Sequence, residues 1–395
     1  MSVPALRFIQ FESNDWQQKR LDSFLEKVSK PVKVEPNKLY REIGIRSHGK
    51  GIFHKQPIKG SELGNKRVFW VQPNALALNI VFAWEQALGV TSDAESGFIA
   101  SHRFPMYVPK SNACSTKFLK YLFLTRKGKS YLELASPGGA GRNKTLGQKN
   151  FDKLVVNLPT LQEQTKIANF LTAVDEKITQ LTQKCELLAQ YKTGVMQQIF
   201  SQVLRFKDDD GQDFPDWEAK QLCEISQINP KAKSLPDEFI YIDLESVVKG
   251  NLLKENWVNY DEAPSRAQRF LSRGDVLFQT VRPYQSNNLF FNKIGYYVAS
   301  TGYAQLRAFE DPKFLYYCLH LDEFIGEVVN RCIGTSYPAI NSTELATIEV
   351  SVPVQKEQTK IANFLTAIDD KLTHTQGQLT AAKQYKQGLL QQMFV

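Results

Sequence analysis

Arginine, histidine and small polar side chains gather in several glycine-flanked or polar segments of this 395-residue chain. In double-stranded DNA, base edges are distinguished by arginine, lysine, asparagine and glutamine, while phosphates accept bonds from basic, hydroxyl and backbone N–H groups. The candidate residues of the first half are Arg46, His48, Lys50, His102, Arg103, Arg142, Asn143 and Lys144. Those of the second half are Arg266, Arg269, Arg273, Arg282, Gln285, Asn287, Thr301, Tyr303, Thr335, Ser336 and Tyr337. As a set they predict contacts to DNA, although each one alone fits a solvated loop equally well.

Motifs for catalysis are weak in comparison. Pro137–Thr145 nearly matches a phosphate-binding loop, but Asn143 stands where that motif needs glycine, and the corresponding loop Gly334–Pro338 has no such pattern. The tetrapeptide Asn229–Ala232 lacks the second proline and the aromatic residue of an adenine-methyltransferase motif. The five histidines show no metal-ligand spacing and no nucleophile context. We therefore expect no enzymatic activity, no metal and no cofactor in this chain.

Charge is distributed unevenly along the chain. Residues 1–160 carry 25 Lys and Arg against 12 Asp and Glu, a net +13, whereas residues 201–354 carry 15 against 22, a net −7. The basic first segment favours a polyanionic partner such as nucleic acid. Five scattered cysteines indicate a reducing compartment, and no run approaches the ~20 apolar residues of a membrane span, so a cytoplasmic protein is expected.

The chain contains two copies of one plan. Asn157–Phe200 and Ser351–Phe394 share 22 of 44 positions at an offset of 194. A weaker repeat opens each half, where Leu6–Phe8 corresponds to Leu204–Phe206, and an Asp-Trp pair follows in both. Joining the C-terminus to the N-terminus would nearly recreate the internal junction between the copies. We therefore expect the two ends of the chain to lie close together.

Each repeated segment shows apolar residues at alternating steps of four and three, which is typical of a coiled-coil helix. Thr160 and Glu163 form a capping-box pattern at the start of the first helix. The predicted seam consists of Ile167, Leu171, Val174, Ile178, Leu181, Leu188, Ile361, Leu365, Ile368, Leu372, Leu379 and Leu389. Antiparallel pairing of the two stripes is favoured over packing of each helix on its own globular half. Lys192 and Lys386 occupy matched seam positions, where they could fix the register, contact another subunit or extend their stems toward solvent.

The stretches between the repeats have the pattern of mixed α/β domains. Apolar runs at 67–71, 77–82, 276–280, 289–291 and 306–309 predict strands, and each half closes with a helix, a glycine loop, a short strand and a proline. The predicted fold class is α+β, with two pseudo-symmetric mixed α/β target-recognition domains separated by a long antiparallel two-helix coiled coil. The predicted boundaries are 1–156 for domain 1, 157–202 for spacer helix 1, 203–350 for domain 2 and 351–395 for spacer helix 2.

The paired helices, the matched openings and Gly274–Pro283 resemble the specificity subunits of type I restriction–modification systems over essentially the whole chain. The resemblance implies a non-catalytic protein of phage defence and DNA methylation. Each of its domains would contact one half of an interrupted, asymmetric DNA site, and the helices would set the gap. It also implies two modification (methyltransferase) subunits, which use S-adenosylmethionine, and restriction subunits, which use ATP with Mg²⁺. The alternative from the residues is a coiled-coil adaptor that binds proteins and not DNA.

Overall fold

The computed structural model describes residues 4–138, 144–334 and 336–394. The chain divides into two compact units, of which unit 1 is Met1–Thr182 with Gly377–Val395 and unit 2 is Gln183–Gln376. Each unit therefore combines one of the diverged segments with parts of both repeated helices. No helix in the described part of the chain has the length and apolar character needed to cross a membrane.

Unit 1 is built around a four-stranded sheet with the order β2-β11-β8-β9 and a cluster of short paired strands. Its core packs that sheet against α2 and α3, and Phe118, Tyr121, Leu122 and Phe123 of α2 are fully buried there. The strands of this unit are β1 (Gln17–Arg20), β2 (Leu25–Val28), β3 (Leu39–Tyr40), β4 (Ile43–Arg46), β5 (Gly51–His54), β6 (Ile58–Lys59), β7 (Val68–Trp70), β8 (Leu76–Leu78), β9 (Leu88–Val90), β10 (Ile99–Ser101), β11 (Met106–Pro109) and β12 (Val155–Leu158). The helices are η1 (Ile9–Phe11), α1 (Leu21–Phe24), η2 (Gly60–Leu63), η3 (Ala83–Glu85), η4 (Asp93–Glu95), η5 (Lys110–Asn112), α2 (Thr116–Leu124), α3 (Arg126–Leu134) and α4 (Gln148–Asp152).

Unit 2 repeats this plan with the sheet β14-β23-β20-β21 and adds a second four-stranded sheet, β18-β15-β22-β19. Its strands are β13 (Glu218–Gln221), β14 (Ser226–Ile228), β15 (Glu238–Ile242), β16 (Val247–Val248), β17 (Asn251–Leu252), β18 (Asn256–Asn259), β19 (Ala267–Phe270), β20 (Val276–Gln279), β21 (Leu289–Phe290), β22 (Tyr297–Ser300), β23 (Tyr303–Ala308) and β24 (Glu349–Val352). The helices are α6 (Leu222–Ile225), η7 (Tyr260–Glu262), η8 (Pro283–Gln285), α7 (Pro312–Cys318), α8 (Asp322–Asn330) and α9 (Ser342–Ala346). The apolar runs at 67–71, 276–280, 289–291 and 306–309 coincide with β7, β20, β21 and β23 within a few residues. Of the run 77–82 only residues 77–78 belong to a strand, β8, and the rest is loop.

The correspondence between the units extends beyond the repeated helices. In both, a strand at the start pairs antiparallel with the strand before the long helix, β1 with β12 and β13 with β24. The four-stranded sheets match strand for strand, and the helix pairs α2–α3 and α7–α8 follow the equivalent strands β11 and β23. The α+β fold with two pseudo-symmetric halves is therefore confirmed, although the diverged segments share no obvious sequence identity.

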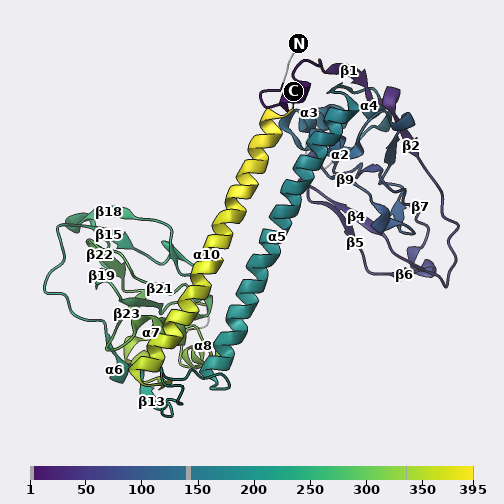
Figure 1. The fold of residues 1–395 in the computed structure, drawn as a ribbon. Helices are drawn as coiled ribbons and strands as arrows, with labels where there is room; N and C mark the ends of the chain where they lie inside the picture. The colour runs from purple at the N-terminus through teal and green to yellow at the C-terminus, as the bar shows by residue number, and fades with distance from the viewer. Residues whose placement is uncertain (1–3, 139–143, 335, 395) are drawn as a thin grey trace. The chain divides into compact units, whose positions relative to one another are not determined.

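The repeated segments form two long helices, α5 (Leu161–Phe200) and α10 (Gln355–Gln392), which are teal and yellow in Figure 1. None of the predicted seam residues is exposed, which confirms the 3.5-residue apolar stripe. The fully buried members are Ile167, Leu171, Leu181, Ile361, Leu365, Ile368 and Leu389, and the half-buried ones are Val174, Ile178, Leu188, Leu372 and Leu379.

Within each unit the stripe packs on the other helix and on the globular part together. In unit 1, Ile167 and Leu171 of α5 share one hydrophobic cluster with Leu389 and Met393 of α10 and with the core around Phe118. In unit 2, the end of α5 shares a cluster with the first half of α10 and with α7. Because the start of α5 packs with the end of α10, and the end of α5 with the start of α10, the two helices run antiparallel. The two packing modes weighed from the sequence therefore occur at the same time.

The matched seam lysines form ion pairs between the helices. Lys386 Nζ lies 2.6 Å from Asp175 Oδ1 in unit 1, and Lys192 Nζ lies 2.6 Å from Asp369 Oδ1 in unit 2. Each aspartate also accepts a hydrogen bond from a tyrosine hydroxyl of the globular part, Tyr121 at 2.8 Å and Tyr317 at 2.9 Å. The lysines thus serve to fix the register rather than only extending toward solvent.

The two junctions between the repeats are equivalent in structure as well as in sequence. Leu204 N donates to Gln198 O at 2.9 Å at the internal junction, and Leu6 N donates to Gln392 O at 2.9 Å where the ends of the chain meet. Figure 1 shows the start of the chain beside the end of α10. The expectation that the ends lie close together is confirmed.

The repeated opening motif binds the start of each long helix through a buried glutamate. Glu163 is fully buried, and its two carboxylate oxygens accept from Arg7 Nε at 2.7 Å and Nη2 at 2.8 Å, while Trp16 Nε1 donates to it at 3.3 Å. Thr160 Oγ1 accepts from the Glu163 backbone N–H at 3.4 Å. The hydroxyl half of the predicted capping box is therefore present, whereas the carboxylate bonds to Arg7 and Trp16. We call Arg7, Trp16 and Glu163 latch 1.

An equivalent arrangement, latch 2, occurs in unit 2. Arg205 Nη2 donates to Glu357 Oε2 at 2.8 Å and Nε to Oε1 at 3.3 Å, and Trp217 Nε1 donates to Oε2 at 3.2 Å. Glu357 is also fully buried. The Asp-Trp openings noticed in the sequence therefore supply the indole donor of each latch.

Candidate nucleic-acid interface

The loop after β8 is the centre of a cluster of loops in unit 1. Ile80 N donates to Arg103 O at 3.0 Å, and Leu146 N donates to Ile80 O at 2.8 Å. These bonds join three segments that are far apart in the sequence, residues 79–86, 101–104 and 144–147. We call this loop cluster 1.

The loop after β20 occupies the equivalent place in unit 2. Thr280 N donates to Gly302 O at 3.0 Å, and Ile340 N donates to Thr280 O at 3.1 Å. Residues 279–286, 300–302 and 336–340 form loop cluster 2. Both clusters therefore stand at the same end of a central strand and are held by the same pair of backbone bonds.

Loop cluster 1 contains half of the described candidates of the first half, His102, Arg103 and Lys144. His102 and Arg103 are exposed, and Lys144 Nζ lies 5.4 Å from the centroid of the Trp84 ring. The tip of the β4–β5 hairpin contacts the same cluster, because His48 N donates to Glu85 O at 2.7 Å.

The remaining candidates of the first half belong to that hairpin or fall outside the description. Arg46 and Lys50 are exposed at the hairpin tip, where the Arg46 guanidinium lies 4.5 Å from the Phe53 ring. Arg142 and Asn143 lie outside the described residues. The structure thus gathers three candidate segments of the first half, 46–50, 102–103 and Lys144, around one loop.

Loop cluster 2 brings together candidates from three segments of the second half. The Arg282 guanidinium lies 4.2 Å from the centroid of the Tyr337 ring, and Arg282 N donates to Pro338 O at 2.7 Å. Gln285 is exposed in the same loop, and its side-chain oxygen accepts from Gln279 Nε2 at 3.0 Å. Ser336 is exposed beside Tyr337, whereas Thr335 lies outside the described residues.

Arg266 joins this cluster through the backbone. Thr301 N donates to Arg266 O at 2.8 Å, which brings the exposed Arg266 next to the turn between β22 and β23. Arg266 and Thr301 are therefore close to the cluster although they are 35 positions apart in the sequence. Arg269 and Arg273, which are near Arg266 in the sequence, lie elsewhere in unit 2.

Three candidates of the second half lie outside loop cluster 2. Arg273 precedes β20, at the opposite end of that strand from Arg282, and its Nε donates to Asn292 at 2.7 Å. Arg269 lies in β19 of the other sheet, where burial lowers the pKa of its guanidinium. The side-chain oxygen of Asn287 accepts from Lys249 N at 3.0 Å.

Tyr303 is a core residue, and the expectation that it contacts DNA is wrong. Its side chain is 1 % exposed and packs among Ile242, Leu277 and Phe291 at the start of β23. Its hydroxyl donates to Asp243 O at 3.4 Å, and burial raises its pKa. The ring would have to leave the core to contact a polymer.

Two aromatic residues of the loop clusters were missed from the sequence. Trp84 lies in η3 beneath Lys144, and Tyr284 is 54 % exposed in η8, next to Arg282. Both occur eight residues after the first residue of a buried central strand, Leu76 and Val276 respectively. Aligning the halves at these strands would have revealed them.

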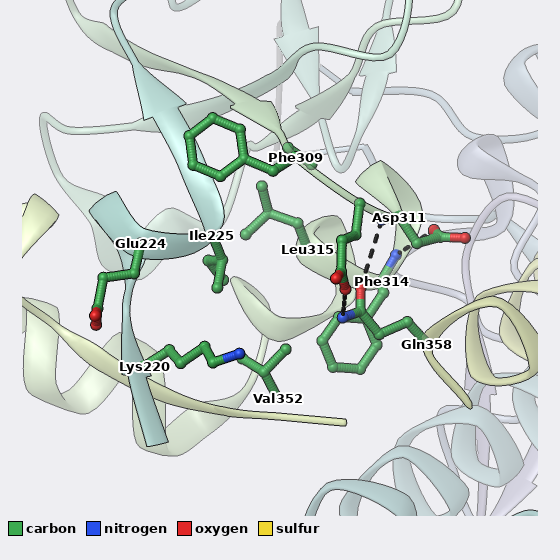
Figure 2. Close-up of a pocket in the computed structure, with 11 residues that line it drawn as sticks. Lys220, Glu224, Ile225, Phe309, Asp311, Phe314, Leu315, Val352 and Gln358 are labelled. Carbon is green, nitrogen blue, oxygen red and sulfur yellow. Dashed lines mark hydrogen bonds between the residues drawn. The ribbon is translucent and has the colours of Figure 1, made fainter. Parts of the chain in front are cut away.

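The pocket in Figure 2 lies at the start of α10 in unit 2 and is a structural joint. Gln358 Nε2 donates to Pro353 O at 2.9 Å and also to Glu310, and its side-chain oxygen accepts from Asp311 N at 3.4 Å. The pocket has a volume of about 80 Å³, which is smaller than the roughly 300–1,000 Å³ of sites that hold small molecules. In unit 1, Gln164 makes the equivalent bonds to Pro159 O and Ser115 N, both at 2.9 Å.

Comparison with known proteins finds one family. The family model "Type I restriction modification DNA specificity domain" matches residues 14–189 and again residues 215–384. The MjaVIII specificity subunit of Methanocaldococcus jannaschii is 25% identical over 275 residues, which are 63% of this chain and 63% of that protein. The MjaIX specificity subunit of the same organism is 21% identical over 330 residues, 76% of this chain and 75% of that protein. The chain thus spans less than two thirds of the first of these relatives.

The fold also resembles a solved structure. The crystal structure of the S subunit of a type I restriction–modification system from M. genitalium aligns with a TM-score of 0.63 and 15% identity, covering 100% of this chain and 99% of that one. At this identity the likeness concerns the fold alone. It is consistent with the duplicated arrangement found within the chain.

Proposed function

This chain belongs to the family of type I restriction–modification DNA specificity domains, and we propose that it is the subunit that selects the DNA sequence of such a complex. Loop cluster 1 and loop cluster 2 each contact one half of an interrupted site in double-stranded DNA. Helices α5 and α10 set the number of base pairs between the halves. The observation that carries this proposal is the equivalent placing of basic and aromatic side chains in two diverged loop clusters on one repeated scaffold.

The two clusters differ in their residues although their backbone bonds are the same. A scaffold that repeats while its loops diverge supplies two different recognition surfaces, which is what an asymmetric bipartite sequence requires. The proposed partners are two modification subunits, which carry out methyl transfer, and restriction subunits, which cleave. The chain itself then catalyses nothing and acts in the cytoplasm.

The experiment is to co-express the chain with the modification subunit of its own system in a host without DNA methylation and map the methylated positions. The expected result is one bipartite motif with a fixed gap, in which both halves carry a methylated base. Purified complex should bind this motif more tightly than a scrambled sequence, and binding should fall steeply as salt rises. Methylation without sequence preference, or at a single undivided motif, would contradict the proposal.

A further inference from the structure

The two loop clusters contain the same kind of contact with its partners exchanged. In loop cluster 1 the central loop supplies the aromatic ring, Trp84, and the 144–147 segment supplies the cation, Lys144, at 5.4 Å. In loop cluster 2 the central loop supplies the cation, Arg282, and the 336–340 segment supplies the ring, Tyr337, at 4.2 Å. Cation–ring contacts occur about once per 70–80 residues in proteins, and here one joins the same two segments in each loop cluster.

The backbone and the side chain of Arg282 are both restricted by their surroundings. Its backbone is left-handed, with φ 54° and ψ 55°, a conformation that arginine rarely adopts. Its main-chain N–H bonds to Pro338, its side chain stacks on Tyr337, and its Nε atom is buried without a hydrogen-bond partner. Within residues 4–138, 144–334 and 336–394, its guanidinium makes no hydrogen bond, so its two terminal nitrogen atoms keep their donors for an external acceptor.

A fixed planar donor pair suits a base edge better than a phosphate. The terminal nitrogens of an arginine match the two acceptors of guanine, O6 and N7, in the major groove. A phosphate contact needs only a positive charge within reach, which a mobile lysine or arginine supplies without a strained backbone. The left-handed backbone and the stacked ring are therefore explained by a need for one orientation.

We propose that Arg282 selects a guanine in the half-site bound by unit 2, and that Tyr337 is its positioning residue. This inference rests on the proposed function, because it assigns one base to the DNA site described there. The neighbouring Tyr284 and Gln285 are exposed on the same loop.

The test compares variants of the full chain in complex with the modification subunits, on DNA in which each half-site position is changed in turn. Arg282→Asn removes the guanidinium but tolerates the left-handed backbone, and Arg282→Lys keeps the charge without the planar donor pair. Both should lose discrimination at one guanine of one half-site by roughly ten- to a hundred-fold, while every other position keeps its preference. Tyr337→Ala should reduce the same discrimination, and Tyr337→Phe should preserve it.

Lys254→Asn is the control, because Lys254 is an exposed cation of the same unit that lies outside loop cluster 2 and pairs with Glu245. It should leave the preference at every position unchanged. Uniform weakening on all sequences by Arg282→Asn, with Arg282→Lys restoring binding, would overturn the inference in favour of a phosphate contact. Unchanged discrimination in both Arg282 variants would also overturn it. If the unaltered complex shows no bipartite motif, the proposed function itself fails.

Discussion

Glu163 and Glu357 are charged side chains without access to solvent, and each is compatible with its position only because an arginine binds it through two parallel bonds. In latch 1 the Arg7 side chain is itself only 5% exposed, so the whole pair is removed from water. Removing one member of a buried pair is far more costly than removing both, since it leaves an uncompensated charge in the core. Each latch therefore holds the opening segment of its unit against the start of a long helix.

Replacing Arg7 by methionine should destabilise unit 1 by about 3–5 kcal/mol, because Glu163 stays buried without its partner. The double variant Arg7→Met with Glu163→Met should regain most of that loss. Urea unfolding of each variant, followed by tryptophan fluorescence, measures the difference. Arg20→Met is the control, because Arg20 pairs with Asp22 on the surface and its loss should change the stability little. Equal losses in the single and double variants would contradict the charge argument.

For individual residues, the sequence indicated which positions matter better than it indicated what each side chain contacts. The Leu-Arg-Phe and Asp-Trp openings were visible as a repeat, but their partner glutamates lie about 150 positions away, and no local pattern links them. Tyr303 illustrates the opposite error, because its polar neighbours suggested a loop while its ring belongs to the first residue of a buried strand. Arg282 was a candidate by its type, but its left-handed backbone and its ring partner come from non-local packing.

Among the elements, the long helices were predictable because a 3.5-residue repeat specifies both their length and their buried stripe. Four of the five apolar runs coincide with strands within a few residues, but most of the run 77–82 is loop. The arrangement of loops was not predictable, since loop cluster 1 joins segments from three parts of the chain through backbone bonds that any sequence can form. The seam lysines occupied the predicted slots, but their acidic partners depend on the antiparallel register.

Asp175 makes the helix pair of unit 1 sensitive to acid. Burial acts to raise its pKa, but the bonds and charges of Lys386, the charge of Lys120 and the Tyr121 hydroxyl outweigh burial and leave the pKa below its usual value. A carboxylate whose pKa is lower in the folded than in the unfolded state adds stability above the unfolded pKa, and loses it as pH falls through the folded pKa.

Asp175→Asn should therefore destabilise the protein by about 1–3 kcal/mol at pH 7, because the variant loses charged hydrogen bonds from Lys386 and Tyr121. The difference from the unaltered protein should shrink toward zero as the pH falls below the usual aspartate range. Thermal unfolding followed by circular dichroism between pH 7 and pH 3 measures it. Glu176→Gln, an exposed neighbour on α5, should show a small effect at every pH. A constant Asp175→Asn difference over this range would rule out the ion pair as its cause.

The whole chain is a duplication in which the scaffold is repeated and the loops have diverged. The latches, the seam ion pairs, the glutamine joints and the two junction bonds recur in both units, whereas the loop clusters share only their backbone pattern. Exchange of one diverged segment should therefore be tolerated, because its connections to the scaffold are the repeated ones.

Replacing residues 20–155 with the corresponding segment of another family member should change one half of the methylated motif and leave the other half and the gap as they are. Latch 1 survives the exchange, because Arg7, Trp16 and Glu163 lie outside the replaced segment. Methylation mapping of the hybrid complex gives the result directly. A change in both halves would show that the two recognition surfaces are not independent.

Under the proposed function, the length of the helix pair determines the number of base pairs between the two half-sites. Each of α5 and α10 begins in one unit and ends in the other, so residues added to both helices lengthen the helix pair. One heptad inserted in the middle of each helix adds about 10 Å at 1.5 Å per residue and preserves the apolar stripe. Along B-DNA, at 3.4 Å per base pair, this corresponds to a gap longer by about three base pairs. Both half-sequences should stay unchanged, since the loop clusters are untouched.

A heptad inserted in α5 alone is the control. The ion pairs Lys192–Asp369 and Lys386–Asp175 cannot then both form, because only one helix is longer. This variant should destabilise the complex without producing a new fixed gap. Methylation mapping of the double insertion decides the matter, because an unchanged gap would mean that the distance is set by the partner subunits and not by these helices.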